Sequence, residues 1–181
     1  FEPLLEQRDQ LLGEVNLELG IADAGYDSRE NCLAVRRRGG VPIIPLNLRG
    51  ETSPEGITNA LGTPLCLIGL PMVYWGRDGN YLKYRCPQVT GKICCLVDHQ
   101  ATNRCSLSPY KLVVKLNMDD DPRRYVPIPR QTKKWGRLYR LRGAAERVNS
   151  RLKEHLILDE LRIRGIAKVR TRLALNVLVM L

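Results

Sequence analysis

The sequence has no long hydrophobic run, which argues against a membrane-spanning helix. Its longest apolar stretch, residues 173–181, is interrupted by Asn176 and is too short to cross a bilayer. A secretory signal peptide is also lacking. Both absences make a membrane surface a poor candidate for the partner of this protein.

Acidic residues are few relative to basic ones. The 181 residues include 19 Asp and Glu against 29 Lys and Arg, which gives a formal net charge of +10 at pH 7. A surplus of positive charge favours a polyanionic partner. Nucleic acid is the first choice, because counterions are released when its phosphates are neutralised.

An initiating methionine is absent as well. Phe1 opens what reads as a continuing polar helix over residues 1–13, and Leu181 ends the chain inside an apolar helical pattern. We therefore expect a fragment of a longer protein. Its length suits one well-packed domain with room for an inserted subdomain.

The six cysteines lack the secretory context of a disulfide framework, so reduced thiols or metal ligands are expected. Cys32 stands alone, and the middle of the chain holds Cys66, Cys86, Cys94, Cys95 and Cys105. Four soft ligands from this set, with His99, could hold a structural Zn²⁺. Their spacing is not that of two CxxC pairs, and buried or incidental thiols remain the alternative.

Residues 137–156 carry the most informative pattern, which predicts one amphipathic helix with three faces. An arc of roughly 80° is apolar and predicts a buried stripe: Leu138, Leu141, Ala145, Val148 and Leu152. A neighbouring arc of roughly 60° holds Tyr139, Arg142, Glu146 and Lys153. A third face is basic. Interleaved charges of this kind are also typical of a solvated helix face supported by i,i+4 pairs.

A strand–helix–strand unit is predicted near the N-terminus. Apolar residues alternate over residues 15–21, which indicates a half-buried strand, and the same parity places Asp23 on the core-facing side where the strand ends. Asp27 and Glu30 have capping-box spacing and start a helix that ends before Gly39. A second strand follows over residues 41–45. Because Asp23 lies shortly before Gly25, it is also compatible with an ordinary turn.

The remaining segments are less regular. Residues 50–110 contain short β-rich pieces between glycines and prolines, and we interpret them as an inserted subdomain. Residues 110–117 predict a further strand, 119–130 a Pro-rich linker that begins with a loop cluster of three aspartates, and a last helix starts near residue 166. Trp75 and Trp135 could each stack on an unpaired base, although packing is the alternative.

The spacing of Tyr139, Arg142, Glu146 and Lys153, YxxRxxxExxxxxxK, resembles the signature helix of insertion-sequence transposases of the DDE class. The upstream segment ADAGYDS, followed by a helix and VPIIPLN, is similar to the part of that family that carries the second acidic residue of the triad. The resemblance implies an α/β fold with a ribonuclease H-like core, in which Asp23 and Glu146 are catalytic ligands of Mg²⁺ or Mn²⁺. It also implies that Tyr139, Arg142 and Lys153 contact DNA.

The same resemblance implies how the chain is divided. Residues 1–49 would be core, 50–110 a β-rich, Cys-containing insertion, and 111–181 a core strand, the linker, the signature helix and the last helix. No residue matches the first triad Asp. We therefore expect an incomplete core that binds DNA but does not cleave it alone.

The implied function is metal-dependent phosphodiester cleavage and strand transfer at insertion-sequence ends. It would be performed by a homo-oligomer assembled on DNA, in the cytoplasm of a prokaryote and associated with its nucleoid. Two other readings remain open. One is a non-catalytic, basic, zinc-containing DNA-binding module or transposase remnant, and the other is a structural protein with an incidental positive surface.

Overall fold

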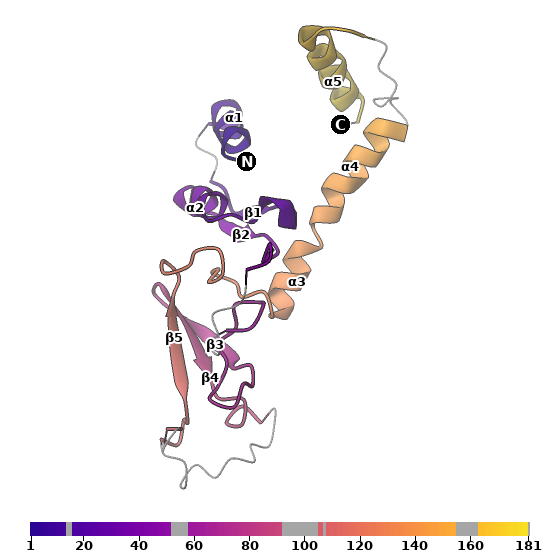
Figure 1. Cartoon of the computed structure of the whole chain (residues 1–181). Coiled ribbons are helices and arrows are strands. Elements are labelled where there is room, and N and C mark those ends of the chain that lie inside the picture. The colour runs from indigo at the N-terminus through magenta and orange to yellow at the C-terminus, as the bar shows by residue number, and fades with distance from the viewer. Residues whose placement is uncertain (14–15, 52–57, 92–104, 107, 155–162, 181) are drawn as a thin grey trace. The chain divides into compact units, whose positions relative to one another are not determined.

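The computed structural model contains both helices and strands (Figure 1), and it describes residues 1–13, 16–51, 58–91, 105–106, 108–154 and 163–180. In chain order the elements are α1 (Glu2–Leu12), β1 (Leu19–Ile21), the 3-10 turn η1 (Ala24–Tyr26), α2 (Arg29–Arg37), β2 (Val41–Ile43), β3 (Val73–Asp78), β4 (Tyr81–Arg85), β5 (Val113–Asn117), α3 (Lys133–Tyr139), α4 (Arg142–Glu154) and α5 (Ile166–Met180). They form two compact units, residues 1–139 and 140–181. None of the described helices is long and apolar enough to span a bilayer.

The predicted strand–helix–strand unit is present. β1 pairs with β2 in parallel, with Leu19 opposite Val41 and Ile21 opposite Ile43. Helix α2 forms the crossover connection that a parallel pair of strands needs. The change of hydrophobic period from two to 3.6 indicates where the strand gives way to this helix. The carboxyl end of β1 therefore leads directly into the loop that carries Asp23.

Helix α2 ends as predicted but begins one residue later than expected. Its N-cap is Ser28, whose hydroxyl accepts a hydrogen bond from the Asn31 N–H at 3.1 Å. The capping role predicted for Asp27 was therefore wrong. After α2, Gly39 has a φ of 78°, a left-handed conformation that glycine adopts without steric cost.

The face of β1 that packs on α2 is made of small residues. Gly20 is buried, and a Cβ added to it would lie 2.4 Å from the Val35 side chain. Ala22 is buried too, in a cluster with Cys32 and Ile44. The predicted parity of β1 was therefore wrong, and Asp23, on the opposite side, is exposed.

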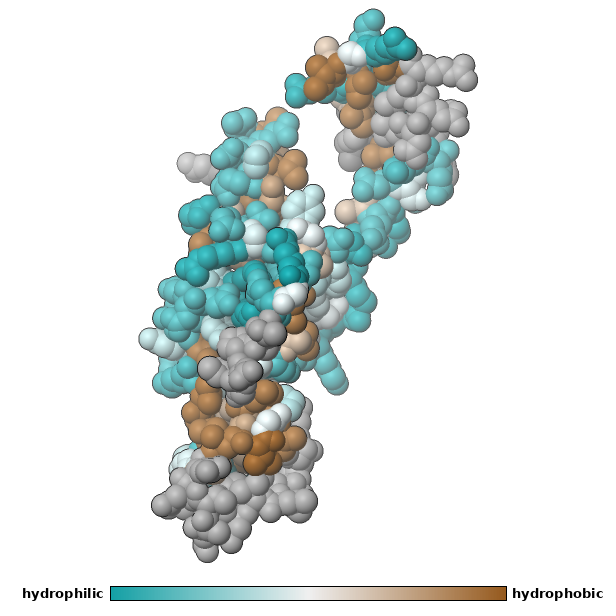
Figure 2. All heavy atoms as spheres, viewed as in Figure 1, coloured by the Kyte–Doolittle hydropathy of each residue, from teal (hydrophilic) through white to brown (hydrophobic). Residues whose placement is uncertain are grey.

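β3, β4 and β5 form an antiparallel sheet with β4 in the centre. Its core is a cluster of Met72, Leu82, Tyr84 and Met118. The strand predicted over residues 110–117 is present as β5, and it pairs with β4. Figure 2 shows hydrophobic residues gathered over this part of the first unit.

The segment predicted as a Pro-rich linker is packed against the rest of the first unit. Arg130 is 7% exposed, and its guanidinium donates hydrogen bonds to the carbonyl oxygens of Ile44 at 2.9 Å, Arg123 at 2.8 Å and Arg124 at 3.2 Å. Since α3 begins three residues later, Arg130 fixes the start of that helix to the end of β2.

The helix predicted over residues 137–156 is interrupted. α3 ends at Tyr139 and α4 begins at Arg142, and at the junction the Gly143 and Ala144 N–H groups bond three residues back, to Arg140 and Leu141. Gly143, a poor helix former, favours such a break. Residues 155 and 156 lie outside the described part of the chain.

The predicted apolar stripe is also not buried. Leu141 and Val148 are 55% and 45% exposed, and no residue of α4 is buried. Figure 2 shows mainly hydrophilic residues along this helix. Among the described residues of the second unit, the stripe on α4 therefore stays accessible to solvent.

Candidate active site

Asp23 lies where β1 gives way to η1. Its side chain is exposed and accepts a hydrogen bond from the Ala24 N–H at 2.8 Å, so Asp23 caps η1. The carboxyl ends of parallel strands are the usual place for ligands in α/β sheets. Asp23 is thus a solvent-accessible carboxylate at a position suited to a ligand, although it also has the turn role that its sequence allows.

Asp27, four residues later, has the opposite environment. Its side chain is fully buried, one carboxylate oxygen accepts from the Asn47 N–H at 2.7 Å, and the same oxygen is 3.4 Å from Nε of Arg123. Burial raises the pKa of this carboxyl, while the Asn47 N–H and the Arg123 guanidinium act in the opposite direction. Asp27 is therefore a structural carboxylate beside an accessible one.

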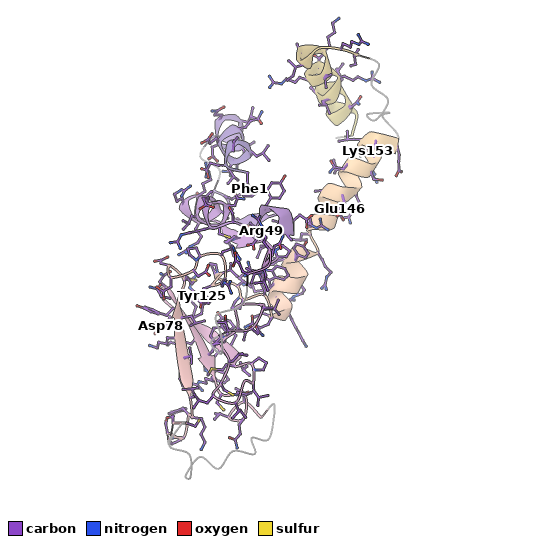
Figure 3. The ribbon with its side chains drawn as sticks, in the orientation of Figure 1. Phe1, Arg49, Asp78, Tyr125, Glu146 and Lys153 are labelled. Carbon is purple, nitrogen blue, oxygen red and sulfur yellow. The ribbon has the colours of Figure 1, made fainter. Side chains whose placement is uncertain are left out.

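Glu146 lies on α4 and shares one face of that helix with Arg142 and Lys153. The three residues fall within an arc of about 40° in an α-helix. The Glu146 carboxylate is 2.9 Å from the Arg142 guanidinium, an i,i+4 ion pair, and remains 59% exposed. Figure 3 shows Glu146 and Lys153 along α4.

Tyr139 does not share a helix with these three residues, contrary to the prediction. It is the last residue of α3, where its ring stacks on Trp135 with 4.9 Å between the ring centroids. Trp135 is half-buried and is used here in packing, which was the alternative to base stacking.

The two acidic residues belong to different compact units, Asp23 to residues 1–139 and Glu146 to residues 140–181. Their donor chemistry fits a hard cation such as Mg²⁺, because carboxylate oxygens are its preferred protein ligands and both side chains are exposed. Within the described part of the chain, however, no three His, Cys, Asp or Glu side chains gather as a metal site would need.

The proposed zinc ligands are only partly described. Cys86 is buried, Cys66 and Cys105 are half-buried, and all three are free thiols. Cys94, Cys95 and His99 lie outside the described residues. The described cysteines give no support for Zn²⁺, and Cys66 packs against the apolar cluster of the β3–β4–β5 sheet instead.

The three aspartates after β5 form a loop, as predicted. Asp119 is 2.9 Å from the Arg36 guanidinium and accepts from the Asn80 amide at 2.6 Å. Asp121 pairs with Arg124 at 3.0 Å. These carboxylates connect α2, the β3–β4 hairpin and the 119–130 segment, which is a structural role.

One face of the β3–β4–β5 sheet combines cations with exposed aromatic rings. The Arg85 guanidinium carbon lies 4.1 Å from the ring centroid of Trp75 and 5.4 Å from that of Tyr110. Lys83 and Lys115 line the same cavity, whose volume is about 390 Å³. Trp75 is 53% exposed, with the Arg85 guanidinium over one face of its ring, whereas Trp135 is half-buried.

Sequence reasoning missed the arginines that hold the Asp23 loop. Arg49 donates to the Gly25 and Asp27 carbonyl oxygens, and Arg123 lies against the Asp27 carboxylate. Arg123 is 96 positions from Asp27 in the chain, and no local pattern connects the two. The one available signal was the presence of three arginines in a short segment whose prolines restrict its backbone.

Comparison with known families matches the whole chain, residues 1–181, to the family described as Transposase DDE domain. The protein belongs to this family of transposases, which act in transposition and DNA recombination. Membership implies a ribonuclease H-like fold, consistent with the mixed α/β architecture, and also DNA binding. Neither the curated proteins nor the solved structures include a match.

Proposed function

We propose that this chain carries two of the three catalytic carboxylates of a DNA transposase that cleaves and joins DNA at insertion-sequence ends. The observation that carries the proposal is the presence of both acidic motifs, ADAGYDS and YxxRxxxExxxxxxK, in the family's order within a chain that matches the family throughout. Asp23 and Glu146 are the assigned carboxylates.

Asp23 and Glu146 would hold divalent ions, Mg²⁺ or Mn²⁺. When bound, such ions activate the attacking water or 3′-hydroxyl and stabilise the leaving 3′-oxygen. Glu146 is exposed and already paired with Arg142, so its position on α4 is supported before any ligand binds. Asp23 is supported by its hydrogen bond from Ala24.

The cations beside Glu146 would align the scissile phosphate. Arg142 can donate two parallel hydrogen bonds to a phosphate, and Lys153 places a single charge about two helical turns beyond Glu146. Tyr139, at the end of α3, can donate its hydroxyl to a neighbouring phosphate. Such positioning contributes to the rate because the reacting groups are held in place before the reaction.

The β3–β4–β5 sheet would provide a second DNA contact. Its cavity joins the exposed Trp75 ring with three cations, which suits a polyanion with stackable bases. We propose that residues 50–110 are the β-rich, Cys-containing insertion into the core, and β5, which follows it in the chain, pairs with its strand β4. The remaining residues belong to a core whose first Asp is not among those assigned here.

We further propose that the protein acts as a homo-oligomer assembled on DNA at the nucleoid of a prokaryotic cell. A second candidate, a DNA-binding module or transposase remnant without catalysis, is favoured by one observation. No third carboxylate gathers with Asp23 or with Glu146 among the residues that the structure describes.

The test is cleavage of labelled element-end DNA with Mg²⁺ or Mn²⁺. We expect the 181 residues to bind this DNA without cleaving it, and the protein extended upstream along its reading frame to cleave it. In the extended protein, Glu146→Gln should lower the cleavage rate about a thousandfold, or about 4 kcal/mol in the barrier, because a metal ligand is lost.

Glu154→Gln is the matched control, since Glu154 lies on the same helix and accepts a hydrogen bond within it, from the Ser150 hydroxyl at 2.7 Å. Its cleavage rate should stay within twofold of the unchanged protein. Binding without cleavage by every variant would instead support the remnant. Nicking by the 181 residues alone would show that their carboxylates are sufficient.

A further inference from the structure

The turn that carries Asp23 is held from outside by two side chains, Arg49 and Asn31, which donate three hydrogen bonds to it. The Gly25 and Asp27 carbonyl oxygens accept from the Arg49 guanidinium at 3.3 and 3.2 Å, and the Tyr26 carbonyl oxygen accepts from the Asn31 amide at 2.8 Å. Three successive carbonyl groups are thus fixed. An isolated turn of this length would have only its own backbone bonds to define its shape.

Arg49 has a backbone conformation that a non-glycine residue seldom adopts. Its φ is 48°, in the left-handed region, and its N–H donates to the Asn47 side chain at 3.2 Å. Strain of this kind persists only where the surroundings stabilise it, and it is often found near functional sites. In Figure 3 Arg49 is labelled beside the turn.

Asp27 holds the same turn through its buried side chain. Its fully buried carboxylate accepts from the Asn47 N–H at 2.7 Å, so residues 47 and 49 both bond the turn. Burying a carboxylate is unfavourable unless it is paired and hydrogen-bonded, and Arg123 supplies the charge. Asp27 and Arg49 therefore connect the segment after β2 to the loop after β1.

We infer that Asp27 and Arg49 are positioning residues for Asp23: they hold the turn so that the Asp23 carboxylate is oriented for a divalent ion. This inference rests on the proposed function, in which Asp23 is a metal ligand. Side chains that orient a metal ligand typically change metal affinity 10–100-fold when they are removed. Neither residue would itself touch the ion or the DNA.

The test uses Arg49→Ala in the upstream-extended protein, with Mn²⁺ affinity measured by electron paramagnetic resonance and cleavage measured against Mg²⁺ concentration. We expect both half-saturating concentrations to rise about tenfold, with unchanged affinity for element-end DNA. Arg37→Ala is the matched control, because Arg37 is an exposed arginine of the same unit that pairs with Glu2 and not with a residue of the turn. It should change neither value more than twofold.

Asp27→Asn provides a second variant of nearly the same volume, expected to weaken Mn²⁺ binding in the same direction. If it fails to fold, Arg49→Ala decides alone, since Arg49 is on the surface. An Arg49→Ala protein with unchanged Mn²⁺ affinity overturns the inference, and so does one that loses DNA affinity instead, because Arg49 would then be a DNA contact.

Asp23→Asn separates the inference from the function on which it rests. If Asp23→Asn abolishes cleavage and Mn²⁺ binding but Arg49→Ala changes neither, the positioning role is wrong and the assignment of Asp23 stands. If Asp23→Asn leaves both intact, the proposed role of Asp23 fails, and the inference fails with it.

Discussion

At the scale of single residues, the interior of the first unit contains ionisable groups whose chemistry is altered by burial. Burial lowers the pKa of Arg130 and raises that of Asp27. It also raises the pKa of the Cys32 thiol to about 11, and Cys32 is completely buried. In each case burial disfavours the charged form, and hydrogen bonds or opposite charges offset part of the cost.

The shifted pKa of Cys32 predicts a loss of stability at alkaline pH. The folded protein retains the thiol proton up to about pH 11, whereas the unfolded chain releases it near 9.0. The stabilising contribution is therefore complete below pH 9 and is lost as pH rises from 9 to 11, by about 3 kcal/mol. Denaturant unfolding from pH 8 to 11 measures it.

Cys32→Ala is the control for this prediction. Tyr84 also titrates at high pH, since burial raises its pKa to about 12, so the wild type must be compared with a variant that differs only at Cys32. The difference in unfolding free energy between the two proteins should shrink as pH rises. A constant difference would contradict a buried, protonated thiol.

Residue roles of this kind were the least predictable part of the molecule. Asp27 has the spacing of a helix cap, and only the fold reveals that it is buried against Asn47 and Arg123. Arg130 sits in a segment that reads as a linker, yet its three acceptors are main-chain carbonyls. Side chains that bond to distant backbone leave no periodic signal in a sequence.

At the scale of elements, local patterns predicted the strand–helix–strand unit, the end of α2 before Gly39 and the strand β5. The face of β1 was predicted wrongly, because the alternation rule assigns large apolar residues to the core. Here the helix-facing side is Gly20 and Ala22, which allow α2 to approach the strand closely. The exposure of Asp23 follows from that inversion.

Trp75 on the β3–β4–β5 sheet predicts a measurable affinity for unpaired bases. Trp75→Ala should weaken binding of single-stranded DNA about tenfold, because stacking on an aromatic ring contributes about 1–3 kcal/mol per base. The melting temperature should change little, since the ring is half exposed. Fluorescence anisotropy with a labelled oligothymidylate measures the affinity.

Tyr81→Ala is the matched control, an exposed aromatic residue of the same sheet that does not line the Trp75 cavity. It should leave binding within twofold of wild type. Equal losses from both substitutions would indicate a general effect on the sheet and contradict a specific role for Trp75.

At the scale of the whole molecule, packing is concentrated in the first unit. The described apolar clusters all lie in residues 1–139, around Leu82 and Tyr84, around Ala34 and Val35, and around Cys32 and Ile44. In the second unit α4 has no buried residue. Resistance to local opening should follow this distribution, since buried contacts determine its free energy.

Hydrogen exchange followed by mass spectrometry tests this distribution. We expect the amides of β4, the central strand, to exchange most slowly and those of α4 to exchange orders of magnitude faster in the protein without DNA. Similar protection in α4 and β4 would mean that the apolar stripe of α4 is covered in solution. Denatured protein provides the reference for intrinsic exchange rates.

The three hydrogen bonds from Arg130 have a consequence for how this architecture can change over evolutionary time. One of them joins Arg130 to the carbonyl oxygen of Ile44, the residue after β2, so the chain between these two residues starts and ends at the same place. The entropic cost of closing such a loop grows only slowly with its length. A segment held in this way can be lengthened, shortened or exchanged for another while the strand before it and the helix after it stay in place.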